Sequence, residues 1–226
     1  MADVICIGAH PDDVEIGMGG TVAGLVRRGL SVLCIDLTDG EPTPRGTHEA
    51  RMDEAQHAAG LLGMERVTLD LPNRSLFDTV EARSAVAEFL RLERPHLMFV
   101  PYPVDAHPDH IAASSIATAA RFYGKFTKTE MRGEPHYVPR LYHYMAVHLR
   151  LVERPSFVVD VSDDLERKLE ALAAYRSQFS ANPANEHVIA AMEGTARMWG
   201  AMIGVAAGEP FFAPEPVGVG SVETLI

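Results

Sequence analysis

The chain has 226 residues, of which 47% are hydrophobic and 23% charged, and its net charge is -11 with histidine counted as neutral. This acidic balance argues against a nucleic acid or an anionic membrane as the main partner, because both would repel the protein. No apolar run is long enough to cross a membrane and no basic segment opens the chain, so we expect neither a signal peptide nor a membrane span. The expected location is the cytoplasm.

Four short apolar runs alternate with helical stretches in the first half of the chain. The runs are rich in Val, Ile and Leu, which is typical of buried parallel strands, and they cover residues 3–9, 31–38, 66–71 and 96–102. Helices are expected at residues 17–28, 47–62 and 79–94, with Thr47 as an N-cap and Gly63 as a stop. This alternation predicts right-handed crossovers and an α/β fold, a Rossmann-like, doubly wound, mostly parallel sheet with helices on both faces.

The second half of the chain is less regular. Two further strands are expected within residues 136–147 and 156–162, then an amphipathic helix at 162–179 capped by Ser162, a helix at 187–203 and a tail rich in Pro and Gly. Helical spacing predicts a packing face, which could lie at a subunit contact, for Met192, Met198, Trp199 and Met202. We expect a single domain over residues 1–226, in which 1–125 form the Rossmann-like core and 126–226 add the C-terminal strands and helices.

The stretch GAHPDDVEIGMGG, residues 8–20, follows the first expected strand and invites comparison with a nucleotide-binding turn. Gly17 and Gly19 provide the first two glycines of a dinucleotide-binding motif, but the third position holds Val22. The chain also has no Gly-Lys-Ser or Gly-Lys-Thr sequence for a phosphate-binding loop. The turn therefore does not predict nucleotide binding.

Metal-ligating side chains follow two strands whose ends should meet. In an open α/β sheet the binding crevice lies beyond the carboxyl ends of the strands, where the strand order reverses. If the order is 3-2-1-4-5, the first and fourth strands are neighbours there. Two groups then converge from opposite walls, namely His10, Asp12 and Asp13 from one, and Asp105, His107, Asp109 and His110 from the other. Each group contains a His-Pro-Asp tripeptide, so we predict a metal site at this place.

The residue types in this cluster suit a catalytic metal. Two imidazoles and one carboxylate leave a coordination position open for water, as in catalytic zinc sites, and the same set also suits ferrous iron. Asp13 lies three residues after His10, so both side chains can face one ion across a single turn. Asp12 then points elsewhere and is free to act as a base.

The two motifs AHPDDVEIGMGG and HPDH, the latter at residues 107–110, resemble those of the PIG-L/LmbE-like de-N-acetylases. The segments LTDGEPTPRGTHEARMDEAQHAAGLLG, LPNRSLFD and AYRSQF are more narrowly similar to the bacillithiol-biosynthesis deacetylase branch of that family. The similarity extends from Val4 to about Phe211 and so covers most of the chain.

The resemblance implies that His10, Asp13 and His110 hold the metal, which is expected to be Zn²⁺, with Fe²⁺ as the alternative. Asp12 matches the general base of the family. His107 matches a second catalytic group, a protonated histidine that stabilises the oxyanion or donates a proton.

Three further positions follow from the resemblance. Asp109 would orient His107, Arg51 matches an arginine that meets the substrate, and Glu41 lies on the loop that borders the sugar site. Related enzymes also carry a tyrosine near the C-terminus, where this chain has Ala207, and some carry one before the second motif, where it has Asp105. The oxyanion role of that tyrosine would fall to His107 or to Tyr102.

The sequence thus predicts a metal-dependent de-N-acetylase that hydrolyses the acetamide of an N-acetylglucosamine conjugate, by resemblance N-acetylglucosaminyl-malate in bacillithiol biosynthesis. One alternative is a related amidase acting on bacillithiol S-conjugates or chito-oligosaccharides. Another is a sugar-binding module without catalysis. The resemblance also implies a homo-oligomer, with a hexamer as one form. The remaining histidines show no ligand spacing and are expected on the surface or in structural roles: His48, His57, His96, His136, His143, His148 and His187.

Overall fold

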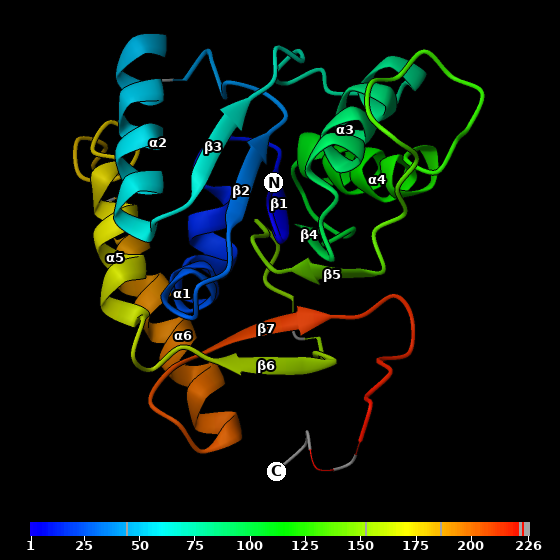
Figure 1. Ribbon diagram of the computed structural model, residues 1–226. Helices are drawn as coiled ribbons and strands as arrows, with labels where there is room; N and C mark the ends of the chain where they lie inside the picture. The colour runs from blue at the N-terminus through cyan, green and yellow to red at the C-terminus, as the bar shows by residue number, and fades with distance from the viewer. Residues whose placement is uncertain (44, 152, 186, 222, 224–226) are drawn as a thin grey trace.

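The computed structural model describes residues 1–43, 45–151, 153–185, 187–221 and 223. Within these ranges one sheet contains seven strands: β1 (Val4–Gly8), β2 (Val32–Asp36), β3 (Glu65–Thr68), β4 (Leu97–Pro101), β5 (Arg140–Tyr144), β6 (Phe157–Asp160) and β7 (Gly208–Phe212). Their order across the sheet is β3-β2-β1-β4-β5-β7-β6 (Figure 1). The predicted order of the first five strands is therefore confirmed, and the strand order reverses between β1 and β4.

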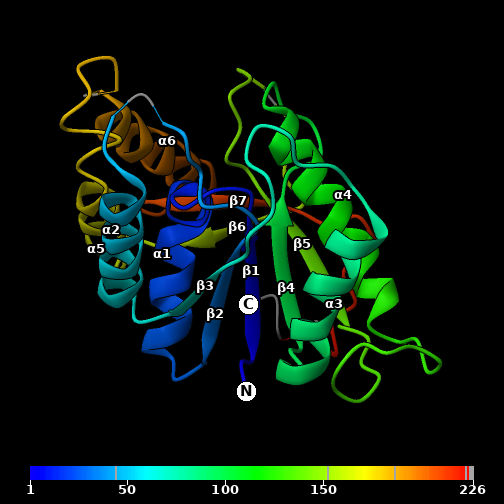
Figure 2. The ribbon, with the colours of Figure 1, turned by 90° about the horizontal axis from the view of Figure 1, so that it is seen from above.

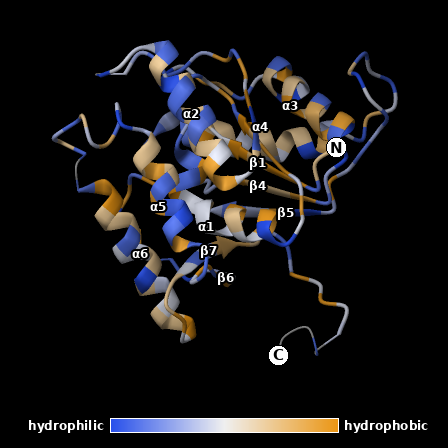
Figure 3. Ribbon diagram, turned by 60° about the vertical axis from the view of Figure 1, so that its left-hand side comes forward, coloured by the Kyte–Doolittle hydropathy of each residue, from blue (hydrophilic) through white to orange (hydrophobic). Residues whose placement is uncertain are grey.

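Helices cover both faces of the sheet, as expected. On one face lie α1 (Asp13–Arg27), α2 (His48–Leu62) and α5 (Leu165–Ala174), with α6 (Val188–Ile203) beside them, and on the other lie α3 (Val80–Glu93) and α4 (Pro108–Tyr123) (Figure 2). Two hydrophobic clusters fill the spaces between the layers, and the strands appear as the hydrophobic centre of the molecule in Figure 3. None of the described helices is both long and apolar enough to cross a bilayer.

Local capping rules located several helix ends correctly. The Thr47 side chain accepts a hydrogen bond from the Ala50 amide at the start of α2, and Gly63 ends that helix with a φ of 75°. Thr79 caps α3 in the same way. These ends were predictable because a cap depends on a few neighbouring residues.

The C-terminal half contains two departures from the sequence-based expectation. Ser162 does not cap α5, which begins at Leu165 after Asp164; its hydroxyl instead donates to Asp160 and accepts from the Ala207 amide. The expected Pro/Gly-rich tail contains β7, which pairs antiparallel with β5 and β6. Its sequence GEPFF has Gly, Glu and Pro where a strand pattern needs regular apolar residues, so long-range pairing decided its conformation.

Helix α1 begins at Asp13, four residues earlier than expected, and is interrupted at Met18, where φ is -153°. A buried ion pair binds the backbone groups at this interruption. The Lys168 ammonium donates to the Ile16 carbonyl over 2.8 Å and to Glu209 over 2.6 Å, while Glu209 accepts from the amides of Gly20 and Thr21. The pair therefore satisfies the backbone groups freed by the break, and it ties the first turn of α1 to α5 and β7.

Gly17 allows this first turn to approach the sheet. A Cβ atom at Gly17 would lie 2.2 Å from the ring of Tyr144, whose hydroxyl donates to the Ile7 carbonyl over 2.7 Å. Gly60, in contrast, lies in α2 with no atom within 4 Å of an added Cβ. The two glycines thus provide a matched pair, one required by a close contact and one not.

We expect Gly17→Ala to lower the free energy of unfolding by about 1–3 kcal/mol, because the extra methyl group forces Tyr144 or α1 to move. Gly60→Ala should raise it by about 0.5–1 kcal/mol, since alanine loses less backbone entropy in a helix. Urea unfolding followed by circular dichroism measures both. Equal stability of the two variants would contradict this account of Gly17.

Candidate metal centre

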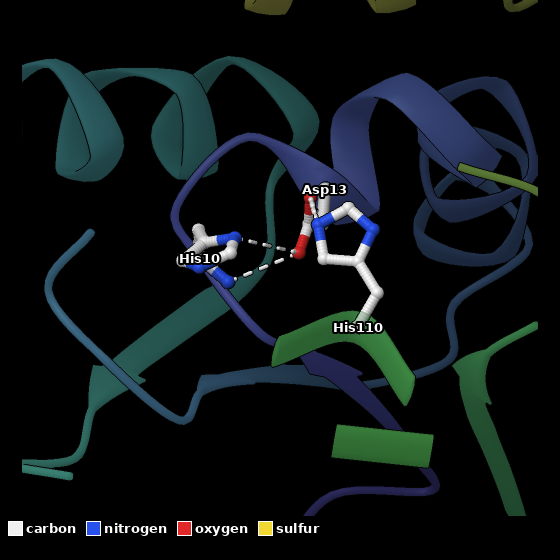
Figure 4. Close-up of side chains that lie close together, drawn as sticks. All are labelled: His10, Asp13 and His110. Carbon is white, nitrogen blue, oxygen red and sulfur yellow. Dashed lines mark hydrogen bonds and ion pairs between the residues drawn. The ribbon is translucent and has the colours of Figure 1, made fainter. Parts of the chain in front are cut away.

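The segments that follow β1 and β4 bring three candidate ligands together at the reversal of strand order. His10 comes from the turn after β1, Asp13 from the first residue of α1, and His110 from the first turn of α4 (Figure 4). All three residues are buried, and their ligand atoms lie within 4.8 Å of one another. The predicted convergence of the two motifs is therefore present in the structure.

Asp13 lies between the two imidazoles. Its Oδ1 is 3.3 Å from His110 Nε2, and its Oδ2 is 3.7 Å from His10 Nδ1. The amides of Ala9 and His10 both donate to Oδ2 over 3.0 Å. Backbone hydrogen bonds thus fix the carboxylate between the two rings before any ion binds.

A second carboxylate stands behind each imidazole. The Nε2 atom of His10 is 3.2 Å from Asp109 Oδ2, and the Nδ1 atom of His110 is 2.5 Å from Asp105 Oδ2. Metal-ligating histidines commonly donate their remaining N–H to a carboxylate, which fixes the ring and raises its basicity. This arrangement, together with the N₂O donor set, fits a divalent ion such as Zn²⁺ or Fe²⁺ held by His10, Asp13 and His110.

The charges around the cluster also favour a cation. Burial alone would lower the pKa of His110, but the carboxylates of Asp13 and Asp105 outweigh burial and raise that pKa to about 10. Burial would likewise raise the pKa of Asp13, yet His110 and His10 hold it well below its usual value. The ring nitrogens therefore face negative charge that a bound metal ion would neutralise.

Asp12 occupies a strained position beside the cluster. Its φ is 110°, in a region that residues other than glycine rarely adopt, and it immediately precedes α1. Burial raises the pKa of its carboxyl to about 7, although the nearby Arg51 opposes that change. The strained turn separates Asp12 from Asp13, so the two adjacent carboxylates take different directions, as the sequence suggested.

His107 is the N-cap of α4, and this role defines its tautomer. Its Nδ1 accepts a hydrogen bond from the Asp109 amide over 3.2 Å, which leaves the proton of the neutral ring on Nε2. Burial, and then the neighbouring His10 and His110, lower the pKa of His107. The geometry therefore supports a neutral N–H donor rather than the protonated histidine that the resemblance implied.

The carboxylate of Asp109 has different partners from those expected. It accepts hydrogen bonds from the amides of Arg74 and Leu76 and approaches His10, while its contact with His107 runs through the backbone. A carboxylate oxygen of Asp109 lies within 4.8 Å of ring nitrogens of both His10 and His107, so the prediction that Asp109 orients His107 stays a prediction.

The cluster opens into a cavity of about 480 Å³. Arg51 lines it as expected, and its Nη2 donates to the Pro11 carbonyl over 2.7 Å and lies 3.4 Å from Asp12 Oδ2. Glu41 does not line the cavity; its carboxylate instead accepts from the amide and hydroxyl of Thr43. The prediction that Glu41 borders the sugar site therefore applies to its loop rather than to its side chain.

His148 also lines the cavity, although its sequence position suggested a surface or structural role. Its ring centroid lies 5.3 Å from that of His110 and 5.6 Å from that of His107, and its amide donates to Asp105 Oδ1 over 2.8 Å. No spacing pattern could reveal His148, because the loop after β5 brings it to the site. Tyr102 packs against Phe212 instead of lining the cavity.

Comparison with known proteins assigns the chain to a family. A model of the PIG-L family, described as GlcNAc-PI de-N-acetylase, matches residues 5–121, a range that contains both groups of candidate ligands. The chain belongs to the PIG-L family. It is accordingly a deacetylase, an amide hydrolase.

Individual relatives of this PIG-L protein agree with the assignment. It is 34% identical to diacetylchitobiose deacetylase of Thermococcus kodakarensis, over 78% of this chain and 70% of the relative. It is 28% identical to the 1D-myo-inositol 2-acetamido-2-deoxy-alpha-D-glucopyranoside deacetylase of Mycobacterium sp. (strain JLS), over 80% of this chain and 75% of the relative. A conserved protein of Thermus thermophilus has the same fold, with a TM-score of 0.89, 39% identity and 97% coverage of each chain.

These relatives do not support the narrower prediction that the chain belongs to the bacillithiol-biosynthesis branch. Their names refer to diacetylchitobiose and to an inositol conjugate, so membership of the bacillithiol branch stays a prediction.

We expect Asp105→Asn to weaken metal affinity by about 10–100-fold, the usual cost of removing a carboxylate that orients a ligating histidine. Asparagine retains an oxygen for the His148 amide but removes the negative charge beside His110. Competition with a chelator measures the affinity. Asp39→Asn is the control, because Asp39 pairs with His48 outside the cluster; unchanged affinity in Asp105→Asn would contradict the role of Asp105.

Proposed function

We propose that this PIG-L deacetylase hydrolyses the acetamide of an N-acetylglucosamine conjugate, using a divalent metal ion held by His10, Asp13 and His110. The observation that carries the proposal is the convergence of these residues with Asp12 and His107 at one cavity. When bound there, the ion supplies Lewis acidity toward the amide carbonyl and makes a water molecule easier to deprotonate.

Asp12 is the group proposed to accept the proton of the attacking water. Burial raises the pKa of its partly buried carboxyl to about 7 in the absence of a metal ion, which suits a group that takes up a proton and releases it again. Arg51, at 3.4 Å from its Oδ2, holds the carboxylate toward the cavity. The same proton can then pass to the nitrogen of the leaving amine, which yields acetate and a free glucosamine conjugate.

His107 is proposed to stabilise the oxygen of the attacked carbonyl. Because its Nδ1 is occupied by the Asp109 amide, its Nε2–H is the group available to the substrate. A hydrogen bond aimed at the oxygen that becomes negative lowers the barrier more than one aimed at the neutral amide.

The finer substrate assignment is N-acetylglucosaminyl-malate. The protein carries a net charge of -11, so an anionic substrate needs a local cation, and Arg51 provides one inside the cavity. A planar guanidinium suits a carboxylate or a pair of hydroxyls. The 34% identity to a diacetylchitobiose deacetylase favours a chito-oligosaccharide as the second candidate. A homo-oligomer, with a hexamer as one form, remains a prediction.

We expect Asp12→Asn to keep stoichiometric metal while its turnover falls by about 10²–10⁴, because the substitution preserves size and removes the base. Acetate release from an N-acetylglucosamine conjugate, together with metal analysis, measures both properties. The matched control is Asp53→Asn, at an exposed position of α2. Turnover near the wild-type rate in Asp12→Asn would assign the base to another group.

We expect Arg51→Ala to lower kcat/KM for the malate conjugate by about one to two decades, since a charge-assisted hydrogen bond contributes about 1.5–3 kcal/mol. The loss should be smaller for free N-acetylglucosamine if Arg51 binds malate, and equal for both if it binds the sugar hydroxyls. Steady-state kinetics at full metal occupancy separates these cases. Unchanged kcat/KM on both substrates would remove Arg51 from substrate binding.

A further inference from the structure

Arg74 is a second arginine on the wall of the metal-centre cavity. It lies between β3 and α3 in the segment LPNRS, to which the proposed function gives no role. The residue is exposed, whereas Arg51 is buried. Arg74 therefore stands where the cavity opens to solvent.

The turn that carries Arg74 is strained and held in place. The φ of Arg74 is 63°, a value that glycine adopts at lower cost. Its amide donates to Asp109 Oδ2 over 2.6 Å, and the Leu76 amide donates to Oδ1 over 3.2 Å. Because the same carboxylate lies 3.2 Å from His10 Nε2, the position of the turn is fixed relative to the metal centre.

The guanidinium of Arg74 has a single hydrogen-bond partner among the described residues. Its Nη2 donates to the Pro42 carbonyl over 2.6 Å, and no carboxylate of the described ranges forms an ion pair with it. Arg51, in contrast, donates to the Pro11 carbonyl and lies 3.4 Å from Asp12 Oδ2. Arg74 thus has more donors left for a ligand than Arg51.

The other fixed charges of the cavity are matched. Asp12 faces Arg51, and Asp13 faces the imidazoles of His10 and His110. Arg74 adds a positive charge to the wall that no described side chain balances, which suits an anionic group of the ligand. One guanidinium balances one negative charge, and its planar donors match the two oxygens of a carboxylate.

We propose that Arg74 determines substrate specificity by binding a carboxylate on the group joined to the N-acetylglucosamine. This inference rests on the proposed function and narrows its substrates to acidic conjugates, of which the malate conjugate is one. The acetamide of such a substrate would lie at the metal centre, with its carboxylate against Arg74 at the open side of the cavity.

The first experiment compares acetate release from carboxymethyl and carbamoylmethyl N-acetylglucosaminides by the metal-loaded full chain. These glycosides differ in charge and hardly in size. We expect kcat/KM to be about fivefold higher for the acid, the effect of a charge pair that water still reaches. Equal values would overturn the role of Arg74 while leaving the proposed function intact. No acetate from either glycoside would overturn the proposed function.

Variants of Arg74 tie the preference to its charge. Arg74→Gln should make the acid and the amide equal substrates, and Arg74→Lys should keep part of the preference because the charge remains. Arg45→Gln is the matched control, since Arg45 is also exposed but does not line the cavity. A preference that persists in Arg74→Gln would overturn the proposal. An equal loss for both substrates would reduce Arg74 to a tether of Pro42 and overturn it as well.

The second experiment does not depend on turnover. Calorimetry measures the binding of the amine products, carboxymethyl and carbamoylmethyl glucosaminide, to the metal-loaded chain. The acid should bind about fivefold more tightly to the wild type and no more tightly than the amide to Arg74→Gln. Equal affinities in the wild type would overturn the proposal even if neither glycoside is hydrolysed.

Arg150 is the alternative cation. It lines a hollow of about 270 Å³ that shares Ile16 and Met192 with the cavity. Arg74 is favoured because Asp109 holds its backbone and Pro42 holds its side chain. Loss of the acid preference in Arg150→Gln, but not in Arg74→Gln, would assign the carboxylate to that hollow and overturn the role of Arg74.

Discussion

The parallel pairing of β1 with β4 is the constraint on which the site depends. The register places Val4 opposite Leu97 and Cys6 opposite Phe99, so both strands end at the same edge of the sheet. The chain turns into α1 after one strand and into α4 after the other, and each turn carries its His-Pro-Asp tripeptide to that edge. Histidines far apart in sequence thereby face one carboxylate.

Successive hydrogen bonds hold the candidate metal centre in place, starting from Asp13. Backbone amides fix this carboxylate, the two imidazoles face it, and Asp109 and Asp105 hold the opposite nitrogens of those rings. The outer carboxylates are held in turn, Asp109 by the amides of Arg74 and Leu76. Such support matters because carboxylates behind ligating histidines fix the orientation of the rings and increase metal affinity.

The C-terminal half contributes more than an edge to the sheet. Lys168 and Glu209 bind the backbone groups left free by the break in α1, one turn beyond the candidate metal ligand Asp13. The loop after β5 brings His148 to the cavity. The same half provides α6, which lines a second hollow next to the cavity with Met192, Met198 and Trp199. The candidate catalytic groups thus come from the doubly wound core, whereas C-terminal elements line part of the cavity beside them.

Local and chemical rules were sufficient for the first five strands, for the ends of α2 at Thr47 and Gly63, and for the convergence of the two motifs. These features depend on side-chain periodicity, short-range capping and the direction of parallel strands. Each of them can be inferred from residues that are close together in the sequence. The tertiary structure decided which carboxylate supports which histidine, the inward position of His148 and the conformation of β7. Those outcomes depend on how side chains from distant segments pack against one another, and no spacing along the chain encodes that packing.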